Sequence, residues 1–172
     1  MPRVELEQAI RTRRTHKAFA PDPVPREVIE EVLELARWAP NHRLTEPWRF
    51  RVLGPASFER LVAVGEPSER SKLGRSPVLV VASATQTGDD YQDEEDALAT
   101  ACAVYIVLLA AHDRGLASYW RTPALLETAE GRAAVGLRDD ERFVALIHLG
   151  RPLTEPTAKE RRPPSEYVEF LD

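Results

Sequence analysis

Four short segments of this sequence combine positively charged side chains with other hydrogen-bond donors. They are Arg13–Lys17, Asn41–Arg43, Trp120–Thr122 and Lys159–Arg161. Guanidinium groups hold phosphate through paired hydrogen bonds, and tryptophan offers an apolar face to a flat ring. These residue types suit a planar ligand that carries phosphate. Scattered surface charge is the alternative, and composition does not choose among nucleotides.

Other kinds of chemistry have weaker support in the residue types. No serine lies in a Gly-x-Ser-x-Gly turn, and Cys102 falls in an apolar segment, which argues against a nucleophilic enzyme. The histidines His16, His42, His112 and His148 occur singly, as packed or surface histidines do more often than metal ligands. No glycine-rich turn follows an expected strand, which disfavours a dinucleotide-binding fold.

The stretch Arg37–Phe50 has an unusual composition for a connection between a helix and a strand. It contains two prolines, two tryptophans, three arginines and the pair Asn41–His42. Ordinary connections of this kind are short. We therefore expect this stretch to form the wall of a binding site.

Apolar periodicity predicts the elements that must position these groups. Helical spacing predicts a short helix over residues 4–13, ending at the cationic segment, where positive charge near a helix end is the simpler explanation. A second helix starts at Pro25, at the first helical position, and ends before Pro40. Residues 65–76 are polar and are expected to be mobile.

Alternating or continuous apolar runs predict strands over Trp48–Val52, Val78–Ala82, Leu116–Arg121 and Phe143–Leu149. The run at Val78–Ala82 predicts a central strand buried on both faces. Further helices are expected over Ser57–Val64, Glu94–Arg114 and Leu125–Val135. This mixed order indicates an α+β sandwich in which helices cover a small sheet.

The helix expected over Glu94–Arg114 is apolar on almost every side between Ala97 and Ala111. Such a helix must be covered all round, either at the centre of the domain or by a second subunit. Asp93–Asp96 are interpreted as its acidic first turn. A calcium loop is the alternative, but the spaced ligands and the glycine of an EF-hand are absent.

Size and charge limit the class of protein. A chain of 172 residues suits one domain, here residues 1–172, and a net charge of −5 argues against a nucleic-acid partner. The N-terminus lacks the apolar run of a signal peptide, and the uncharged stretch Ala97–His112 is shorter than the roughly 20 residues that span a bilayer. We expect a cytoplasmic protein that neither enters nor binds a membrane.

Motifs along nearly the whole chain resemble the nitroreductase family, in its branch of short NAD(P)H nitroreductases. Ile10–Phe19 is similar to the family's Arg-Arg-Ser opening followed by a basic residue and Phe. Ala36–Phe50 resembles its Ala-Arg-x-Ala-Pro-Ser motif and the following Gln-Pro-Trp. Tyr119–Thr122 and Leu149–Pro152 complete the set in the expected order.

The resemblance implies an α+β nitroreductase-like sandwich with a central mixed sheet, assembled as a homodimer with FMN at the subunit interface. Arg13, Arg14 and Thr15 would hold the phosphate and ribityl chain, and Lys17 would approach the pyrimidine edge of the flavin. The remaining cofactor-binding residues implied are Pro40, Asn41 and His42 of the other subunit, Trp120, Arg121 and Thr122, and the C-terminal Lys159 and Arg161.

The chemistry implied is transfer of hydride from NADH or NADPH, followed by reduction of a nitroaromatic or quinone-like acceptor, in a ping-pong scheme without a catalytic protein residue. Glu46 and Thr15 depart from the family's usual amide and serine. The tail 153–172 is expected to pack on the partner subunit. Alternatives are a non-enzymatic FMN-binding or flavin-sensing protein, and dehalogenation or flavin breakdown on the same fold.

Overall fold

The computed structural model describes residues 5–171, and most of its elements lie where the apolar periodicity predicts them. The α-helices are α1 (Leu6–Thr12), α2 (Arg26–Ala36), α3 (Pro55–Val64), α4 (Pro67–Leu73), α5 (Asp90–Asp113) and α6 (Ala129–Val135). The strands are β1 (Trp48–Val52), β2 (Val78–Thr85), β3 (Ala117–Arg121) and β4 (Glu141–Gly150). Single 3-10 turns are η1 (His42–Leu44), η2 (Ala124–Glu127) and η3 (Pro164–Glu166). The predicted first helix included Val4, which lies outside the described residues.

The four strands form one sheet in the order β1-β2-β4-β3, and every neighbouring pair is antiparallel. The prediction of a mixed sheet is therefore wrong for the named strands. Among residues 5–171, parallel pairing is limited to an isolated bridge between Thr15 and Ser118. The prediction that the strand beginning at Val78 is central and buried is confirmed, because all but the last residue of β2 are buried.

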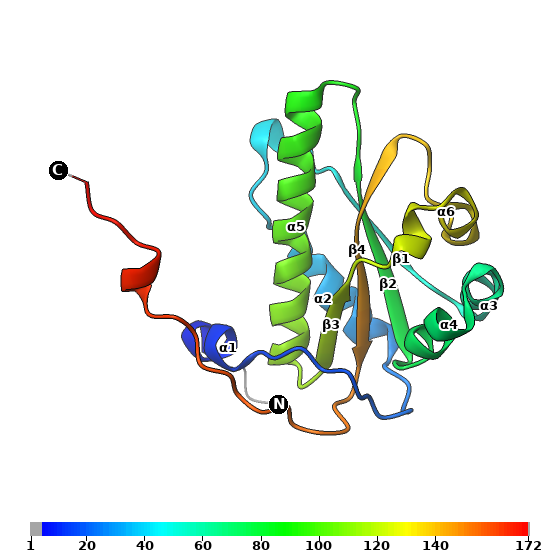
Figure 1. The fold of residues 1–172 in the computed structure, drawn as a ribbon, viewed down its shortest axis with the longest axis horizontal. Helices are drawn as coiled ribbons and strands as arrows, with labels where there is room; N and C mark the ends of the chain where they lie inside the picture. The colour runs from blue at the N-terminus through cyan, green and yellow to red at the C-terminus, as the bar shows by residue number, and fades with distance from the viewer. Residues whose placement is uncertain (1–4, 172) are drawn as a thin grey trace.

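Helices cover both faces of the sheet. Figure 1 shows α5 standing along one face, with α2 beside it, while α3, α4 and α6 cover the other. The α5 side buries a core that contains Val104, Val107 and Ile147, and the opposite side buries a second core around Leu61 and Leu146. The sheet is thus the middle layer of an α+β sandwich, as expected.

The long helix α5 begins earlier than predicted. Asp89 caps it by accepting a hydrogen bond of 3.0 Å from the backbone N–H of Gln92, and Asp93 accepts hydrogen bonds from the backbone of Thr87 and Gly88. Within the described residues, no group of His, Cys, Asp and Glu side chains could hold a metal ion. These aspartates therefore serve the start of the helix.

Helix α5 has 24 residues and, by length and composition alone, could cross a membrane. About half of its most apolar stretch is buried inside the protein, in the core between the helix and the sheet. This packing is that of a core helix and accounts for the apolar composition.

Two expectations for the α3–α6 face are wrong. Residues 65–76 include the helix α4, in which Pro67 occupies the first turn and Leu73 is fully buried. The helix predicted over residues 125–135 is broken, because the Thr128 side chain accepts a hydrogen bond from Gly131 N–H and starts α6 anew. Gly131 lies so close to the chain that an added Cβ would be 1.8 Å from the Leu125 carbonyl oxygen, which no side chain tolerates.

Candidate functional site

A cationic cavity of about 500 Å³ lies beside the loop that follows α1. Its walls come from the beginning and the end of the chain. They are formed by Arg13, Arg14, Thr15, Lys17, Ala18, Thr154, Pro156, Thr157, Lys159 and Arg161. Six of the twelve predicted site residues thus line one cavity, which also offers threonine hydroxyl groups.

Backbone pairing explains why these distant segments meet. The N–H of Ala20 donates to the Arg151 carbonyl at 3.0 Å, and the N–H of Leu153 donates to the Ala18 carbonyl at 3.4 Å. The segment that follows β4 therefore runs beside residues 18–20, which follow the cationic loop Arg13–Lys17. This pairing carries Lys159 toward the end of α1.

The cationic loop is also held against the edge of the sheet. Thr15 bridges to Ser118 in β3, and the His16 N–H donates to the Ser118 carbonyl at 3.1 Å. The side chain of His16 is buried, and its Nδ1 atom has no hydrogen-bond partner within residues 5–171. These backbone contacts fix the loop. The cationic side chains next to His16 take no part in them.

The cations of this cavity are not neutralised by the protein's own carboxylates. The ion pairs found within residues 5–171 include none of Arg13, Arg14, Lys17, Lys159 and Arg161. By contrast, their neighbours Arg11 and Arg162 pair with Glu7 and Glu166. Positive charge without carboxylate partners among the described residues, gathered around a cavity, suits an anionic ligand.

His112, in the last turn of α5, lies next to this charge. Its Nε2 atom is 2.8 Å from the hydroxyl of Thr12. Burial lowers the pKa of His112 below its ordinary value, and the charges of Arg13 and His16 lower it further. A neutral imidazole at this place leaves the cationic side chains as the groups that would bind phosphate.

A second group of predicted residues lies in the connection between α2 and β1. The Nδ1 atom of His42 is hydrogen-bonded to the carboxylate of Glu95 in α5. The Thr45 hydroxyl donates to Asp96 Oδ1 at 2.6 Å, and Asn41 Oδ1 accepts a bond of 3.0 Å from the N–H of Glu46. This loop, with the exposed Pro40 before it, is therefore fastened to the first turns of α5.

The same loop has a strained backbone. Arg43, Leu44 and Glu46 have φ angles of 55°, 53° and 44°, and they are the non-glycine residues with positive φ within the described chain. Each such residue costs on the order of 1 to 3 kcal/mol, which surrounding contacts must offset. Strain concentrated in a stretch that the sequence predicts to be a binding wall supports that prediction.

The two groups lie at opposite ends of α5. His42 contacts Glu95 near the beginning of the helix, whereas Thr12, the last residue of α1 before the cationic loop, contacts His112 near its end. At a rise of 1.5 Å per residue, these two helix positions are about 25 Å apart. A single subunit therefore does not bring His42 to the cationic cavity.

The predicted residues of the third segment point to different sides of β3. Trp120 packs partly against the core on the α5 side. Arg121 is turned the other way, and its Nη2 atom binds Glu69 of α4 at 2.8 Å. Thr122 follows the end of the strand. Trp120 and Arg121 thus lie on opposite sides of the sheet, and none of the three residues is among those that line the cationic cavity.

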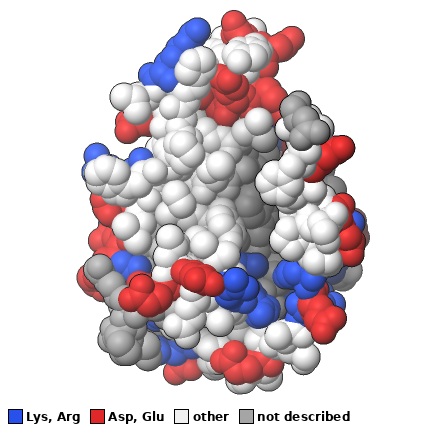
Figure 2. Space-filling view, turned by 90° about the vertical axis from the view of Figure 1, so that its left-hand side faces the viewer, with Lys and Arg blue, Asp and Glu red and all other residues white. Residues whose placement is uncertain are grey.

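One side of α5 remains uncovered by its own chain. Tyr91, Leu98, Cys102 and Tyr105 are exposed at helical spacing. Figure 2 shows a broad uncharged surface in the middle of this side of the molecule, with charged side chains of both signs above and below it. An exposed apolar surface of this kind marks an interaction site.

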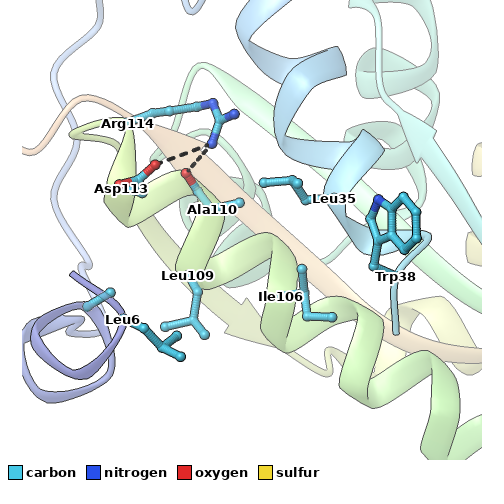
Figure 3. Close-up of a pocket in the computed structure, with 9 residues that line it drawn as sticks. Leu6, Leu35, Trp38, Ile106, Leu109, Ala110, Asp113 and Arg114 are labelled. Carbon is cyan, nitrogen blue, oxygen red and sulfur yellow. Dashed lines mark hydrogen bonds and ion pairs between the residues drawn. The ribbon is translucent and has the colours of Figure 1, made fainter. Parts of the chain in front are cut away.

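A groove of about 460 Å³ extends this surface between α1, α5 and the end of α2. Figure 3 shows Leu6 of α1, Leu109 of α5 and Trp38 around it, with Arg114 at one end bound to Asp113 and to the Ala110 carbonyl. The side chain of Trp38 is 73% exposed. Most of the groove's lining is apolar, and its guanidinium group, that of Arg114, is already engaged within the chain, so the groove is better suited to a protein surface than to phosphate.

Sequence reasoning missed some of the residues that matter here. Thr154 and Thr157 line the cavity, and Asp96 holds the loop through Thr45, but none of these residues carried a signal of its own. The two threonines lie within five residues of Lys159 in the sequence, and this closeness is the feature that could have indicated their place in the cavity. Asp96 was interpreted only as part of an acidic first helical turn.

Comparison with known proteins gives one consistent result. The sequence model described as "Nitroreductase family" matches residues 10–151. YfhC of Bacillus subtilis, whose name assigns it provisionally to the NAD(P)H nitroreductases, is 32% identical over an alignment that covers 92% of this chain and 90% of that protein. YdjA of Escherichia coli strain K12, with a name of the same kind, is 26% identical over 96% of this chain and 98% of that protein.

Solved structures share the fold. The crystal structure of a nitroreductase-like family protein from Bacillus cereus has a TM-score of 0.89 and 24% identity, covering 100% of this chain and 98% of that one. A Desulfovibrio desulfuricans protein provisionally assigned as a nitroreductase, solved in complex with FMN, has a TM-score of 0.83 and 24% identity over 99% of both chains. At this identity the structural likeness establishes the fold.

Proposed function

This chain belongs to the nitroreductase family, and from that premise we propose that it is an FMN-dependent oxidoreductase. It would use NADH or NADPH to reduce nitroaromatic or quinone-like acceptors. The observation that carries the proposal is the cavity where Arg13, Lys159 and Arg161 converge without ion-pair partners among the described residues. The related Desulfovibrio desulfuricans structure, which holds FMN, supplies the identity of the proposed ligand.

The residues of the cavity fit the phosphate end of FMN. Five cationic side chains and three threonine hydroxyls surround it, and a phosphate dianion accepts hydrogen bonds from both kinds of group. Arg13, Arg14, Lys159 and Arg161 would hold the phosphate, and Thr15 would bind its oxygens or the ribityl chain. Lys17 would lie toward the flavin, where a cation stabilises negative charge that develops on reduction.

The remainder of the site requires a second subunit in this proposal. His42 and the cationic cavity are separated along α5 by about 25 Å, so one chain supplies only half of the predicted contacts. If two copies pack their α5 helices antiparallel about a two-fold axis, the beginning of one helix meets the end of the other. Pro40, Asn41 and His42 of one copy would then face the cavity of its partner.

Charge and apolar surface both support this pairing. The beginning of α5 carries Asp89, Asp90 and Asp93, and the cationic cavity lies at its other end. An antiparallel pair would place opposite charges near each other across the apolar surface of α5. Cys102 lies at the middle of the helix, so the two copies of this residue would come close to the symmetry axis.

The tail is proposed to pack on the partner. After η3 it carries Tyr167, Val168, Phe170 and Leu171, of which Phe170 and Leu171 are 93% and 84% exposed. Figure 1 shows this segment running past α1 and away from the sheet. Apolar side chains exposed so fully on an extended segment need another surface, and a second subunit would provide it.

The redox chemistry belongs to the cofactor, because FMN when bound accepts hydride from the nicotinamide and delivers reducing equivalents to the acceptor. The protein's own residues bind and orient. Arg13 and Arg161 would anchor one end of the ligand, while Lys17 would supply positive charge at the other. No side chain is needed as a proton donor for the hydride step, so these binding residues define the site.

The experiment is anaerobic mixing of the FMN-loaded protein with NADH and, separately, NADPH, followed by absorbance near the flavin band. We expect bleaching within seconds, and return of the colour when a nitroaromatic or a quinone is added. Flavin that stays oxidised with both nucleotides would contradict the reductase proposal and favour a binding or sensing role. Failure to bind FMN at all would reject the proposal as a whole.

A further inference from the structure

Asp96 is a buried carboxylate whose position the fold does not require. It lies in the second turn of α5, beyond the first turn where a carboxylate favours the helix dipole. The residue is 2% exposed, and its Oδ1 atom accepts hydrogen bonds from the Thr45 hydroxyl at 2.6 Å and from Gln92 Nε2 at 3.1 Å. Burying a carboxylate is unfavourable unless hydrogen bonds compensate it, so these bonds define what the residue does.

What Asp96 holds is the strained part of the loop. Thr45 lies between Leu44 and Glu46, two of the residues with left-handed backbone. The N–H of Thr45 donates to the His42 carbonyl at 3.3 Å, which closes the turn, and its hydroxyl reaches the buried carboxylate. Left-handed conformations of non-glycine residues persist only where surrounding contacts determine them.

The groups that this conformation presents are exposed, although one of them is bonded to α5. Leu44 is 80% exposed, and the imidazole of His42 projects from the same turn with its ring fixed by Glu95. Hydrogen bonds from His42 and Tyr91 hold the pKa of Glu95 below its usual range, consistent with a carboxylate that stays ionised as an acceptor. The loop is thus clamped at two neighbouring positions of α5.

We propose that Asp96 is a positioning residue for the redox site: through the Thr45 hydroxyl it keeps Arg43 and Leu44 in their left-handed conformation, so that the neighbouring His42 reaches the FMN of the other subunit. This inference rests on the proposed FMN-dependent function. Without the Thr45 hydroxyl, the loop would populate several conformations, and only one of them would present His42 to the FMN. The apparent affinity for FMN then falls in proportion to the fraction of competent loop.

The test uses Thr45→Val, which keeps the shape of the side chain and removes the donor. Thr45 is exposed in the loop, so the valine fits without repacking the core. Thr45→Ser retains the hydroxyl and should behave as the original protein. Thr100→Val is the matched control, because the Thr100 hydroxyl binds the backbone carbonyl of the same Asp96 and does not contact the loop.

Two measurements are made on the full-length protein. The rate of tryptic cleavage after Arg43, followed by mass spectrometry without FMN, reports how firmly the loop is held. The dissociation constant of FMN, from quenching of flavin fluorescence, reports the site. We expect Thr45→Val to be cut about tenfold faster and to bind FMN about tenfold more weakly, with both controls unchanged.

Each outcome decides a different point. Unchanged cleavage of Thr45→Val at Arg43 would overturn the clamp itself. Faster cleavage with unchanged FMN affinity would overturn the positioning role while leaving the proposed function intact. If the unsubstituted protein binds no FMN, the proposed function fails first, and the positioning role falls with it. Only a loss in both measurements, restored by Thr45→Ser, supports the inference.

Discussion

The two ends of α5 differ in how their charges are arranged. At the C-terminal end, five cationic side chains surround a cavity, and the ion pairs of the described chain include none of them. At the N-terminal end, Asp89, Asp93 and Asp96 are all engaged in hydrogen bonds with the protein. One end has charge left over for a ligand, whereas the other uses its charge to hold the backbone in place.

The difference separates a binding role from a folding role. Asp89 and Asp93 are explained by the fold, because they lie at the start of α5 and favour its dipole, whereas Asp96 holds the neighbouring loop through Thr45. The cationic residues exceed what α1 needs, since Arg11 already supplies a basic residue in its last turn. Charge that the fold does not need, and does not neutralise, is therefore the more informative indication of function. Three predictions test this contrast.

The largest expected effect concerns the cationic end. The double substitution Arg13→Ala and Arg161→Ala removes two charge-assisted contacts from the proposed phosphate site. We expect FMN binding to weaken on the order of a hundredfold or more, because each such contact contributes about tenfold or more. The dissociation constant is measured by fluorescence quenching, and circular dichroism verifies the fold.

The matched control is the double substitution Arg11→Ala and Arg162→Ala. These arginines flank the cavity residues in sequence, carry the same charge and pair with Glu7 and Glu166 on the surface. Their loss should change FMN affinity only slightly, because it lowers the net positive charge near the site but removes no contact with the phosphate. Equal losses in the two double variants would mean that net charge, and not the cavity, binds the ligand.

The second prediction concerns His148, a fully buried histidine in β4 that lies against Phe19 and Tyr119. Burial lowers its pKa to about 4, and the charges of Arg121 and Arg75 contribute. The unfolded chain, with a pKa near 6.5, then binds more protons than the native state between these values. The free energy of unfolding should therefore fall as the pH is lowered from about 6.5 to 4, by about 3 kcal/mol from this residue.

Urea unfolding at several pH values checks this prediction. His148→Gln removes the titrating group, so its stability should depend less on pH within that window than that of the original protein. Identical pH slopes in His148→Gln and the original protein would show that His148 does not titrate as inferred.

The smallest expected effect tests whether the two ends work together across subunits. His42→Ala and Arg13→Ala are purified separately, and each should bind FMN weakly. After the subunits are mixed and allowed to exchange, half of the dimers are mixed and each contains one intact site, so about a quarter of the sites should recover. Recovery is measured as tightly bound FMN per subunit.

Each variant unfolded and refolded alone is the control for the mixing experiment. Crosslinking through Cys102, the only cysteine of the sequence, reports the geometry independently, since it lies midway along α5. Absence of any recovery in mixtures that exchange subunits would mean that both ends serve sites within one chain, contrary to the proposed arrangement.

Much of the fold was predictable because helices and strands that are buried on one side carry apolar residues at regular spacing in the sequence. The spacing of apolar residues located α2, β1, β2 and α5 to within a few residues. The polar helix α4 was missed because few apolar side chains mark it, although its Leu73 is fully buried. The break before α6 depends on a hydrogen bond of Thr128 that no pattern announces.

The direction of strand pairing could not be predicted either. Alternation shows which side chains are buried, but parallel and antiparallel neighbours present the same alternation. The expected mixed sheet came from family resemblance, and the pairing of β2 with β1 and β4 is antiparallel throughout. Register and direction are properties of the partner strand, which a single segment does not contain.

The sequence by itself determined which residues could bind a phosphate, because that capacity resides in guanidinium, ammonium and hydroxyl groups. Tertiary structure decided which of them act together. Pairing of Ala18–Ala20 with Arg151–Leu153 brings Lys159 and Arg161 to Arg13, whereas the length of α5 keeps His42 away. Chemical type is local to a residue, but convergence depends on contacts between segments distant in the chain.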